Sequence, residues 1–371
     1  MKNNREKIII LLLIITLIFS LFTIYVSSNT KLSISAKSAV LYEPSTETFI
    51  YRKNENQRLA MASTTKIITA LIAIEKLDLE SPITVDERAI GIEGSSIYLK
   101  SGEILTAEDL IYATMLQSAN DAAAALAYEI SGSIEEFSHL MNSRAESLGL
   151  SDTNFENPHG LDSKNHYTTS HDLAILTAEA LKNEEFKNIS STYQKEIHSS
   201  LVTRILTNHN KLLKKYDGCI GVKTGYTQKS GRSLVSAAER DGLTLISVTI
   251  DAPNDWIDHS SLLDLGFSTL VVKTLANQDE YTYKLPVIGG TVDSVTVSND
   301  IEIKRIFNVA DADFDVEVKL SKYLVAPISE SEIAGQVLFS KNGETIEKIN
   351  LTTKEAVPKE KQNDFFKIFN K

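Results

Sequence analysis

The spacing of apolar residues changes near residue 280, and this change constrains the fold more than any other feature of the chain. From about residue 36 to 275, helical and strand-like stretches alternate, which favours helices packed against an antiparallel sheet. After residue 280, apolar residues recur at every second position, as in Val316, Val318 and Leu320, which is typical of strands. The sequence therefore predicts an α+β domain over residues 36–275, followed by a small all-β sandwich over residues 280–353.

Turn signals locate individual elements within these regions. The dipeptides Asp241-Gly242 and Asn342-Gly343 each separate two strand-like runs, and residues 43–46 separate two more, so three β-hairpins are expected. Apolar residues from Ser63 onward recur at helical spacing, which predicts a helix. Residues 122–130 predict an alanine-rich helix that is buried.

Residues 1–29 have the composition of a membrane segment. An uncharged apolar run over residues 8–26 follows three basic residues. A bilayer span needs about 20 apolar residues, whereas the core of a cleaved signal peptide usually has roughly 7 to 15. We therefore expect a signal anchor rather than a removed signal peptide. Because positive flanks stay in the cytoplasm, we expect the protein at the cell membrane, with everything after residue 30 on the extracytoplasmic face.

The tail over residues 354–371 is charged until a short amphipathic end, from Phe365 to Phe369. Two helical turns are enough to touch a bilayer surface but too short to hold a protein there. We therefore expect a frayed terminus.

Composition and spacing exclude several classes of protein. The formal net charge is -11 and the sequence has no dense basic stripe, so a nucleic-acid partner is not expected. The single cysteine, Cys219, excludes an intramolecular disulfide and a cysteine-based metal cluster. His166 and His171 do not share a helix face, and the chain has no dinucleotide-binding or phosphate-loop motif. Neither a metal nor another cofactor is therefore expected.

Three short motifs follow one another in the α+β region. They are Ser63-Thr64-Thr65-Lys66, Ser118-Ala119-Asn120 and Lys223-Thr224-Gly225. Singly, the patterns S-x-x-K and S-x-N are weak signals, because each occurs elsewhere in the chain and each residue also fits a helix cap or a solvated lysine. However, the first motif opens an apolar helix and the third lies in a strand-like segment. This context, together with the order, indicates a catalytic serine site.

The first motif supplies a nucleophile and a base. Residues three apart on a helix are neighbours, so Ser63 and Lys66 present a hydroxyl and an amine side by side. Lys66 accepts a proton only when it is neutral, so burial and a second cation, Lys223, are expected to lower its pKa. The backbone N–H of Ser63, at the helix start, favours a developing oxyanion.

The remaining motif residues fit a peptide substrate. Ser118 can relay a proton to a leaving amine, and Asn120 can bind a substrate amide. Lys223 and Thr224 offer a cation and a hydroxyl suited to a substrate carboxylate, and Gly225 allows a substrate backbone to lie close to the strand.

With these motifs, the sequence resembles the penicillin-binding, active-site-serine peptidases, and among them the low-molecular-mass D-alanyl-D-alanine carboxypeptidases. The resemblance runs from about Ser38 to Val357. The segments that carry it are residues 62–70, 117–123, 157–162, 166–169, 172–174, 221–227 and 231–235. It implies a β-lactamase/transpeptidase-like catalytic domain, with a carboxy-terminal β domain that holds the catalytic domain off the membrane.

The resemblance also implies the roles of the site residues. Ser63 is the acylated nucleophile, Lys66 the proton acceptor, Ser118 the relay, and Lys223 with Thr224 the carboxylate grip, while the backbone N–H groups of Ser63 and Tyr226 form the oxyanion hole. The implied reaction is attack on the penultimate D-Ala carbonyl of a peptidoglycan stem peptide, release of the terminal D-Ala, and hydrolysis of the acyl-enzyme. β-Lactam antibiotics are implied as acylating inhibitors.

The sequence departs from the family pattern in two places. Some relatives carry an arginine after Lys-Thr-Gly that helps to hold the substrate carboxylate, but residues 251–262 contain none. Either Arg232 substitutes for it, or Lys223 acts without help. Many relatives also attach to the membrane through a longer carboxy-terminal amphipathic helix, whereas here the amino-terminal run would take that role.

Three other functions share some of these features. A class A-type β-lactamase needs a glutamate in an E-x-x-L-N loop, but residues 184–188 have Lys187 where leucine is expected, and the long β domain is foreign to that class. A transpeptidase differs only in its acceptor, an amine in place of water. A non-catalytic penicillin sensor would normally carry further membrane spans and a cytoplasmic output domain. The carboxypeptidase is the favoured function, and these three remain alternatives.

Overall fold

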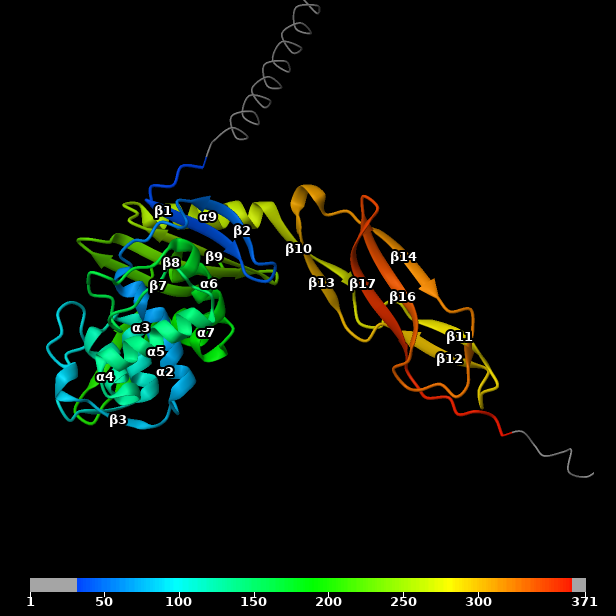
Figure 1. Ribbon diagram of the computed structural model, residues 1–371, viewed down its shortest axis with the longest axis horizontal. Coiled ribbons are helices and arrows are strands. Elements are labelled where there is room, and N and C mark those ends of the chain that lie inside the picture. The colour runs from blue at the N-terminus through cyan, green and yellow to red at the C-terminus, as the bar shows by residue number, and fades with distance from the viewer. Residues whose placement is uncertain (1–31, 362–371) are drawn as a thin grey trace, which may run out of the picture. The chain divides into compact units, whose positions relative to one another are not determined.

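The computed structural model describes residues 32–361, which form two compact units (Figure 1). Among the described residues, the larger unit consists of residues 32–42, 49–237 and 246–263. The smaller unit takes in the chain from Asp264 onward, together with two hairpin turns at residues 43–48 and 238–245.

The predicted membrane segment, residues 8–26, and the amphipathic end, residues 365–369, lie outside the described residues. Within residues 32–361, no helix combines the length and the apolar character that a membrane crossing requires.

A five-stranded sheet lies at the centre of the larger unit, in the order β2-β1-β9-β8-β7. Its strands are β1 (Ser38–Glu43), β2 (Thr48–Lys53), β7 (Cys219–Thr227), β8 (Gly231–Arg240) and β9 (Leu243–Ile250). Asp241 and Gly242 both have positive φ, 50° and 79°, as a two-residue hairpin turn requires. The hairpins predicted at residues 43–46 and at Asp241-Gly242 are confirmed, and β7 lies at an edge of the sheet.

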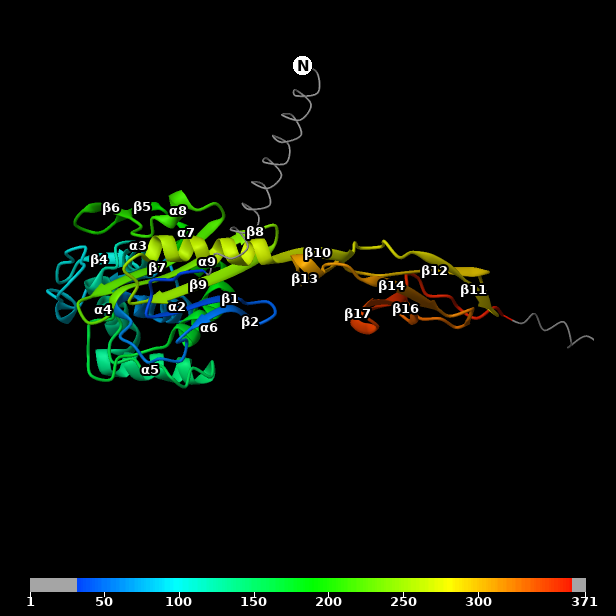
Figure 2. The ribbon, with the colours of Figure 1, turned by 90° about the horizontal axis from the view of Figure 1, so that it is seen from above.

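Both faces of this sheet are covered. Neighbouring strand residues point to opposite faces, and on β9 Val248 belongs to the core shared with the helices, whereas Thr249 Oγ1 contacts His259 Nε2 at 2.9 Å. His259 belongs to α9 (Asp255–Thr269), which runs along the sheet (Figure 2). Because side chains alternate between the two faces of the sheet, α9 covers one face and the other helices cover the opposite face.

The rest of the larger unit is mainly helical. Its helices are η1 (Ala62–Thr65), α2 (Lys66–Lys76), η2 (Glu87–Ala89), α3 (Ala107–Leu116), α4 (Asn120–Ser131), α5 (Ile134–Ser147), α6 (Ser170–Leu181), α7 (Glu184–Ser191) and α8 (Leu212–Lys215). Two small antiparallel pairs of strands lie among them, β3 (Pro82–Thr84) with β4 (Ile104–Thr106), and β5 (Gln194–His198) with β6 (Thr203–Thr207). The first eight residues of α4 are buried, which confirms the prediction of a buried alanine-rich helix.

The helix predicted from Ser63 begins only at Lys66, after the single 3₁₀ turn η1. Two hydroxyl groups bind carbonyl oxygens three residues back: Thr64 Oγ1 donates to Met61 O at 2.7 Å, and Thr65 Oγ1 donates to Ala62 O at 2.8 Å. Such side-chain bonds compete with regular helical bonds and favour a tighter turn.

The smaller unit is all β after α9. Its strands are β10 (Leu270–Ala276), β11 (Tyr283–Ile288), β12 (Ser294–Ser298), β13 (Ile303–Asn308), β14 (Asp315–Leu320), β15 (Leu324–Val325), β16 (Ile333–Lys341) and β17 (Glu344–Thr353), with a 3₁₀ turn, η3 (Val309–Asp311). Six of them form a sheet in the order β14-β16-β17-β12-β11-β15, and β10 pairs with β13.

Apolar side chains join these two layers. Leu275 of β10 shares a core with Phe339 of β16 and Leu351 of β17. Asn342 and Gly343, with φ of 50° and 83°, form the predicted hairpin turn between β16 and β17. The predicted fold class, an α+β domain followed by an all-β domain, is confirmed.

Candidate active site

The Ser63 hydroxyl and the Lys66 amine lie side by side where α2 begins. Lys66 Nζ is 3.1 Å from Ser63 Oγ. The same nitrogen donates to Asn120 Oδ1 at 2.7 Å and to the backbone carbonyl of His159 at 2.5 Å. Three segments that are distant in sequence therefore meet at one buried amine, because Lys66 has no exposed surface.

Burial is the main influence on the charge of this amine. It lowers the pKa of Lys66 well below the usual lysine value, and the charge of Lys223 lowers it further, while Asp121 acts in the opposite direction. The three partners of Lys66 Nζ are a hydroxyl, an amide oxygen and a backbone carbonyl, none of which carries a charge. The neutral amine is therefore favoured.

Lys223 and Ser118 form a second buried pair. Lys223 Nζ donates to Ser118 Oγ at 3.0 Å and to the carbonyl of Thr224 at 2.9 Å. Burial lowers the pKa of Lys223 to about 7. Ser118 has a φ of 58°, and left-handed backbone in a non-glycine residue is often found at functional sites. The structure thus places the hydroxyl of Ser118, the predicted proton relay, in a hydrogen bond with Lys223.

The side chain of Asn120 is held at both ends. Its Oδ1 accepts from Lys66, and its Nδ2 donates to the backbone carbonyl of Glu93 at 2.5 Å. A Cβ on Gly94 would lie 2.8 Å from that Nδ2, so glycine leaves room for the amide. In the structure Asn120 contacts the amine of Lys66, and binding of a substrate amide stays a prediction.

The edge strand β7 approaches Ser63 through Gly225. A Cβ on Gly225 would lie 3.2 Å from the backbone nitrogen of Ser63, so the two backbones are in close contact. Tyr226 follows, and this residue is 67% exposed. Thr224, Gly225 and Tyr226 also line a cavity of about 540 Å³.

Arg232, the other candidate for binding the carboxylate, lies in the wall of the same cavity. Its guanidinium donates to the Asp255 carboxylate, with Nη2 to Oδ2 at 2.8 Å. The structure thus brings Arg232 to the same cavity as Thr224 but already paired with an acid.

The loop that includes Gly160 packs against the backbone next to the predicted nucleophile, Ser63. Gly160 has a φ of +89°, and a Cβ there would lie 1.9 Å from the carbonyl oxygen of Ala62, next to Ser63. Its backbone N–H donates to Asn157 Oδ1 at 2.7 Å, which fixes the turn. Only glycine fits this close approach.

His166 is hydrogen-bonded to Thr65 of η1. Its Nδ1 accepts the backbone N–H of Glu156 at 2.9 Å, so its other nitrogen, Nε2, carries the hydrogen and donates to Thr65 Oγ1 at 2.8 Å. Burial lowers the pKa of His166 to about 4, so the ring is neutral at pH 7. His166 is therefore a positioning residue for the turn that carries Ser63.

Sequence reasoning missed the carboxylate of Asp121, next to Asn120. It accepts the backbone N–H groups of Ile97 and Leu99 at 3.2 and 3.0 Å, and the hydroxyl of Ser96 at 2.6 Å. The loop over residues 96–99 therefore wraps around the beginning of α4. The only signal was the acid directly after the S-x-N motif, which fits the start of a helix as well.

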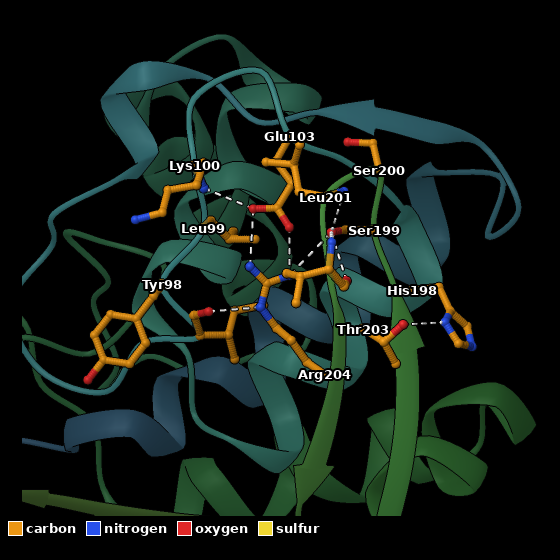
Figure 3. Close-up of polar contacts among 12 residues, drawn as sticks. Tyr98, Leu99, Lys100, Glu103, His198, Ser199, Ser200, Leu201, Thr203 and Arg204 are labelled. Carbon is orange, nitrogen blue, oxygen red and sulfur yellow. Dashed lines mark hydrogen bonds and ion pairs between the residues drawn. The ribbon is translucent and has the colours of Figure 1, made fainter.

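Sequence reasoning also missed the ion pair that holds this loop in place (Figure 3). Arg204 of β6 binds both carboxylate oxygens of Glu103, at 2.6 and 3.1 Å, and its Nε donates to the carbonyl of Ile97 at 3.0 Å. Lys100 N–H donates to the same carboxylate at 2.9 Å. The Glu103 side chain has no exposed surface, and that of Arg204 is 15% exposed.

The sequence matches two protein-family models and several known proteins. A family model described as D-alanyl-D-alanine carboxypeptidase matches residues 25–254, and one described as the C-terminal domain of penicillin-binding protein 5 matches residues 272–359. The chain is 32% identical to D-alanyl-D-alanine carboxypeptidase DacF of Bacillus subtilis, over 97% of this chain and 95% of the relative.

Solved structures give the same result. Penicillin-binding protein 5 from Haemophilus influenzae is 27% identical, with a TM-score of 0.66 over 89% of this chain and 99% of the other. The Streptomyces K15 DD-transpeptidase is 30% identical, with a TM-score of 0.62 over 64% of this chain and 99% of the other.

We predict that Arg204→Met destabilises the protein by about 3 kcal/mol, because it leaves the Glu103 carboxylate buried without its partner. Urea unfolding followed by circular dichroism measures the change. Lys182→Met is the matched control, since Lys182 forms an exposed ion pair with Glu179 and its loss should cost less than about 1 kcal/mol. Equal effects of the two substitutions would contradict the assignment.

Proposed function

The chain belongs to the D-alanyl-D-alanine carboxypeptidase family of serine peptidases, and from this we propose that its reaction proceeds through an acyl-enzyme on Ser63. The family acts on peptidoglycan stem peptides that end in D-Ala-D-Ala and binds β-lactams. The proposal therefore concerns which residues of this chain perform each step, and where in the cell they do so.

One observation carries the assignment of the base. A neutral lysine amine has two N–H groups and one lone pair. Asn120 Oδ1 and the carbonyl of His159 can only accept hydrogen bonds, so they take the two N–H groups of Lys66. The lone pair then faces Ser63 Oγ, which donates its proton along the 3.1 Å contact. This arrangement supports Lys66 as the general base that activates Ser63.

The remaining steps of the proposal assign one role to each neighbouring group. Ser63 Oγ attacks the carbonyl of the penultimate D-Ala while its proton moves to Lys66. The backbone N–H groups of Ser63 and Tyr226 bind the oxyanion, in keeping with the close approach of β7 to Ser63. The proton reaches the leaving amine through Ser118, and water then hydrolyses the ester.

The second lysine binds the other end of the substrate in this proposal. Lys223 and Thr224 hold the terminal carboxylate, and Lys223 also fixes the relay hydroxyl of Ser118 by a 3.0 Å hydrogen bond. Because an arriving carboxylate favours the charged amine, substrate binding raises the pKa of Lys223 and keeps that of Lys66 low.

We also propose that the protein is held at the cell membrane by residues 8–26, with the catalytic domain outside. The support is the uncharged apolar run and the basic residues before it. An uncleaved anchor would leave the two compact units free to reach the wall from a fixed point.

We predict that Ser63→Ala abolishes D-Ala release from a diacyl-Lys-D-Ala-D-Ala peptide, with a loss of at least about a thousandfold, because no nucleophile remains. The assay measures free D-alanine with the full-length protein in detergent. Ser151→Ala, at an exposed serine of the same unit, is the matched control and should retain full activity. Persistent release from the Ser63 variant would disprove the acyl-enzyme assignment.

We predict that kcat/KM falls as the pH is lowered through neutrality. Protonated Lys66 has no lone pair, so activity is present above the pKa of the lysine pair and lost below it. Burial lowers the pKa of Lys223 to about 7 and that of Lys66 well below the usual lysine value. The first proton lost by the coupled pair leaves Lys66 neutral and Lys223 charged, so the acidic limb should lie near or above neutrality. An acidic limb near about 4 would instead indicate a carboxylate base.

We predict that the full-length protein sediments with the membrane fraction and keeps its full mass by mass spectrometry. A variant that lacks residues 1–29 should be soluble and retain D-Ala release. A shortened, soluble product from the full-length gene would show a cleaved signal peptide instead.

A further inference from the structure

Apart from its β7 residues, the cavity of about 540 Å³ beside β7 takes no part in the steps above. Thr224 and Tyr226 of β7 form one wall, and Trp256 of α9 and Tyr193 contribute aromatic rings. Four basic side chains also line the cavity; they are those of Lys211, Lys214, Lys215 and Arg232.

This cavity begins where the substrate's terminal residue is expected. Thr224, which is proposed to hold the terminal carboxylate, is part of the cavity wall. His209 also lines the cavity, and its pKa is lowered by burial and by the charge of Lys223. The cavity therefore lies next to the carboxylate grip, on the side of the leaving residue, and this placement depends on the proposed function.

Its lining combines positive charge with aromatic faces. Lys211 Nζ lies 5.9 Å from the centroid of the Trp256 ring, and Lys214 Nζ lies 3.6 Å from that of Tyr193. The Arg232 guanidinium lies 5.9 Å from the Trp256 ring and is paired with Asp255. Cations suit the carboxylate of a leaving amino acid, and ring faces suit a planar apolar side chain.

The size of the cavity exceeds what D-alanine needs. A leaving D-alanine carries only a methyl side chain, whereas a cavity of about 540 Å³ lies within the range of about 300–1,000 Å³ that holds much larger ligands. The Trp256 ring in the wall of this cavity offers a face to a phenyl or indole group on the terminal residue.

We propose that this cavity is the pocket for the leaving residue and that it accepts a carboxy-terminal D-amino acid with a large aromatic side chain as well as D-alanine. The chemistry is unchanged. The peptide bond between the penultimate D-Ala and the terminal residue breaks, the leaving amine takes the proton that Ser63 gave up, and water hydrolyses the Ser63 ester.

The test compares two peptides, diacyl-Lys-D-Ala-D-Phe and diacyl-Lys-D-Ala-D-Ala, with the full-length protein in detergent. The measured quantity is the ratio of kcat/KM for the D-Phe peptide to that for the D-Ala peptide. The native protein should give a ratio above about 0.1, within the modest discrimination of an apolar pocket. Trp256→Ala should lower this ratio about fivefold, mainly through KM, because the ring contact is lost.

Two further variants make the result specific. Trp256→Phe keeps a ring and should keep the ratio within about twofold, whereas Trp256→Leu keeps apolar volume without a ring and should lower it. If Trp256→Ala does not fold, Trp256→Leu takes its place. Ile257→Ala is the matched control, because Ile257 follows on α9 with 68% exposure outside this cavity, and its ratio should not change.

The possible failures are distinguishable. If D-Ala is released but D-Phe is released at less than about 1% of that rate, the pocket inference is wrong while the proposed function stands. An unchanged ratio in Trp256→Ala and Trp256→Leu would also overturn the inference. If neither peptide is cleaved, the proposed function and this inference fail together.

Discussion

The burial of the Lys66 amine, which lowers its pKa and favours its uncharged form, is the constraint on which the site depends. A charged amine at a position with no exposed surface would cost several kcal/mol in lost hydration, and none of its three polar partners offers a compensating charge. The interior therefore favours the neutral form of lysine, which is the form that the proposed role of general base requires. A carboxylate beside this nitrogen would stabilise the pair and remove the base, so polar but neutral acceptors are what the chemistry requires.

Much of the larger unit serves to keep these neutral acceptors in place. The carbonyl of His159 belongs to a loop fixed by Asn157, and the amide of Asn120 is fixed by the carbonyl of Glu93. Asp121 and the Glu103–Arg204 pair then hold the loop around the start of α4. Charges are thus present, but they lie in the supporting layer and not against the amine of Lys66.

The local pattern of the sequence was sufficient for the fold class and for the hairpins, because turns such as Asp241-Gly242 and Asn342-Gly343 are decided by neighbouring residues. The spacing of Ser63 and Lys66 likewise predicted their contact. The helix start was predicted three residues too early, because hydroxyl bonds from Thr64 and Thr65 tighten the turn.

The rest of the site depends on contacts between distant segments, which no local pattern reports. Glu103 and Arg204 are 101 residues apart in the chain, and each alone has the pattern of a solvated surface charge. The left-handed backbone of Ser118 and the contact of its hydroxyl with Lys223 of β7 likewise depend on contacts between distant segments, not on the S-x-N spacing. No pattern in the sequence indicated that Trp256 and Lys211 line the same cavity, because the two residues come together only in the folded protein.

The close approach of Gly160 to the carbonyl of Ala62 has a consequence for antibiotic resistance. In the proposed mechanism a peptide substrate and a β-lactam acylate the same oxygen, that of Ser63, and both need that oxygen where η1 holds it. A methyl group at Gly160, nearly a hundred residues from Ser63 in the chain, would displace the turn without touching either molecule. Insensitivity gained by this route would remove the enzyme's own turnover as well, so selection by a drug has no useful variant to find at this position.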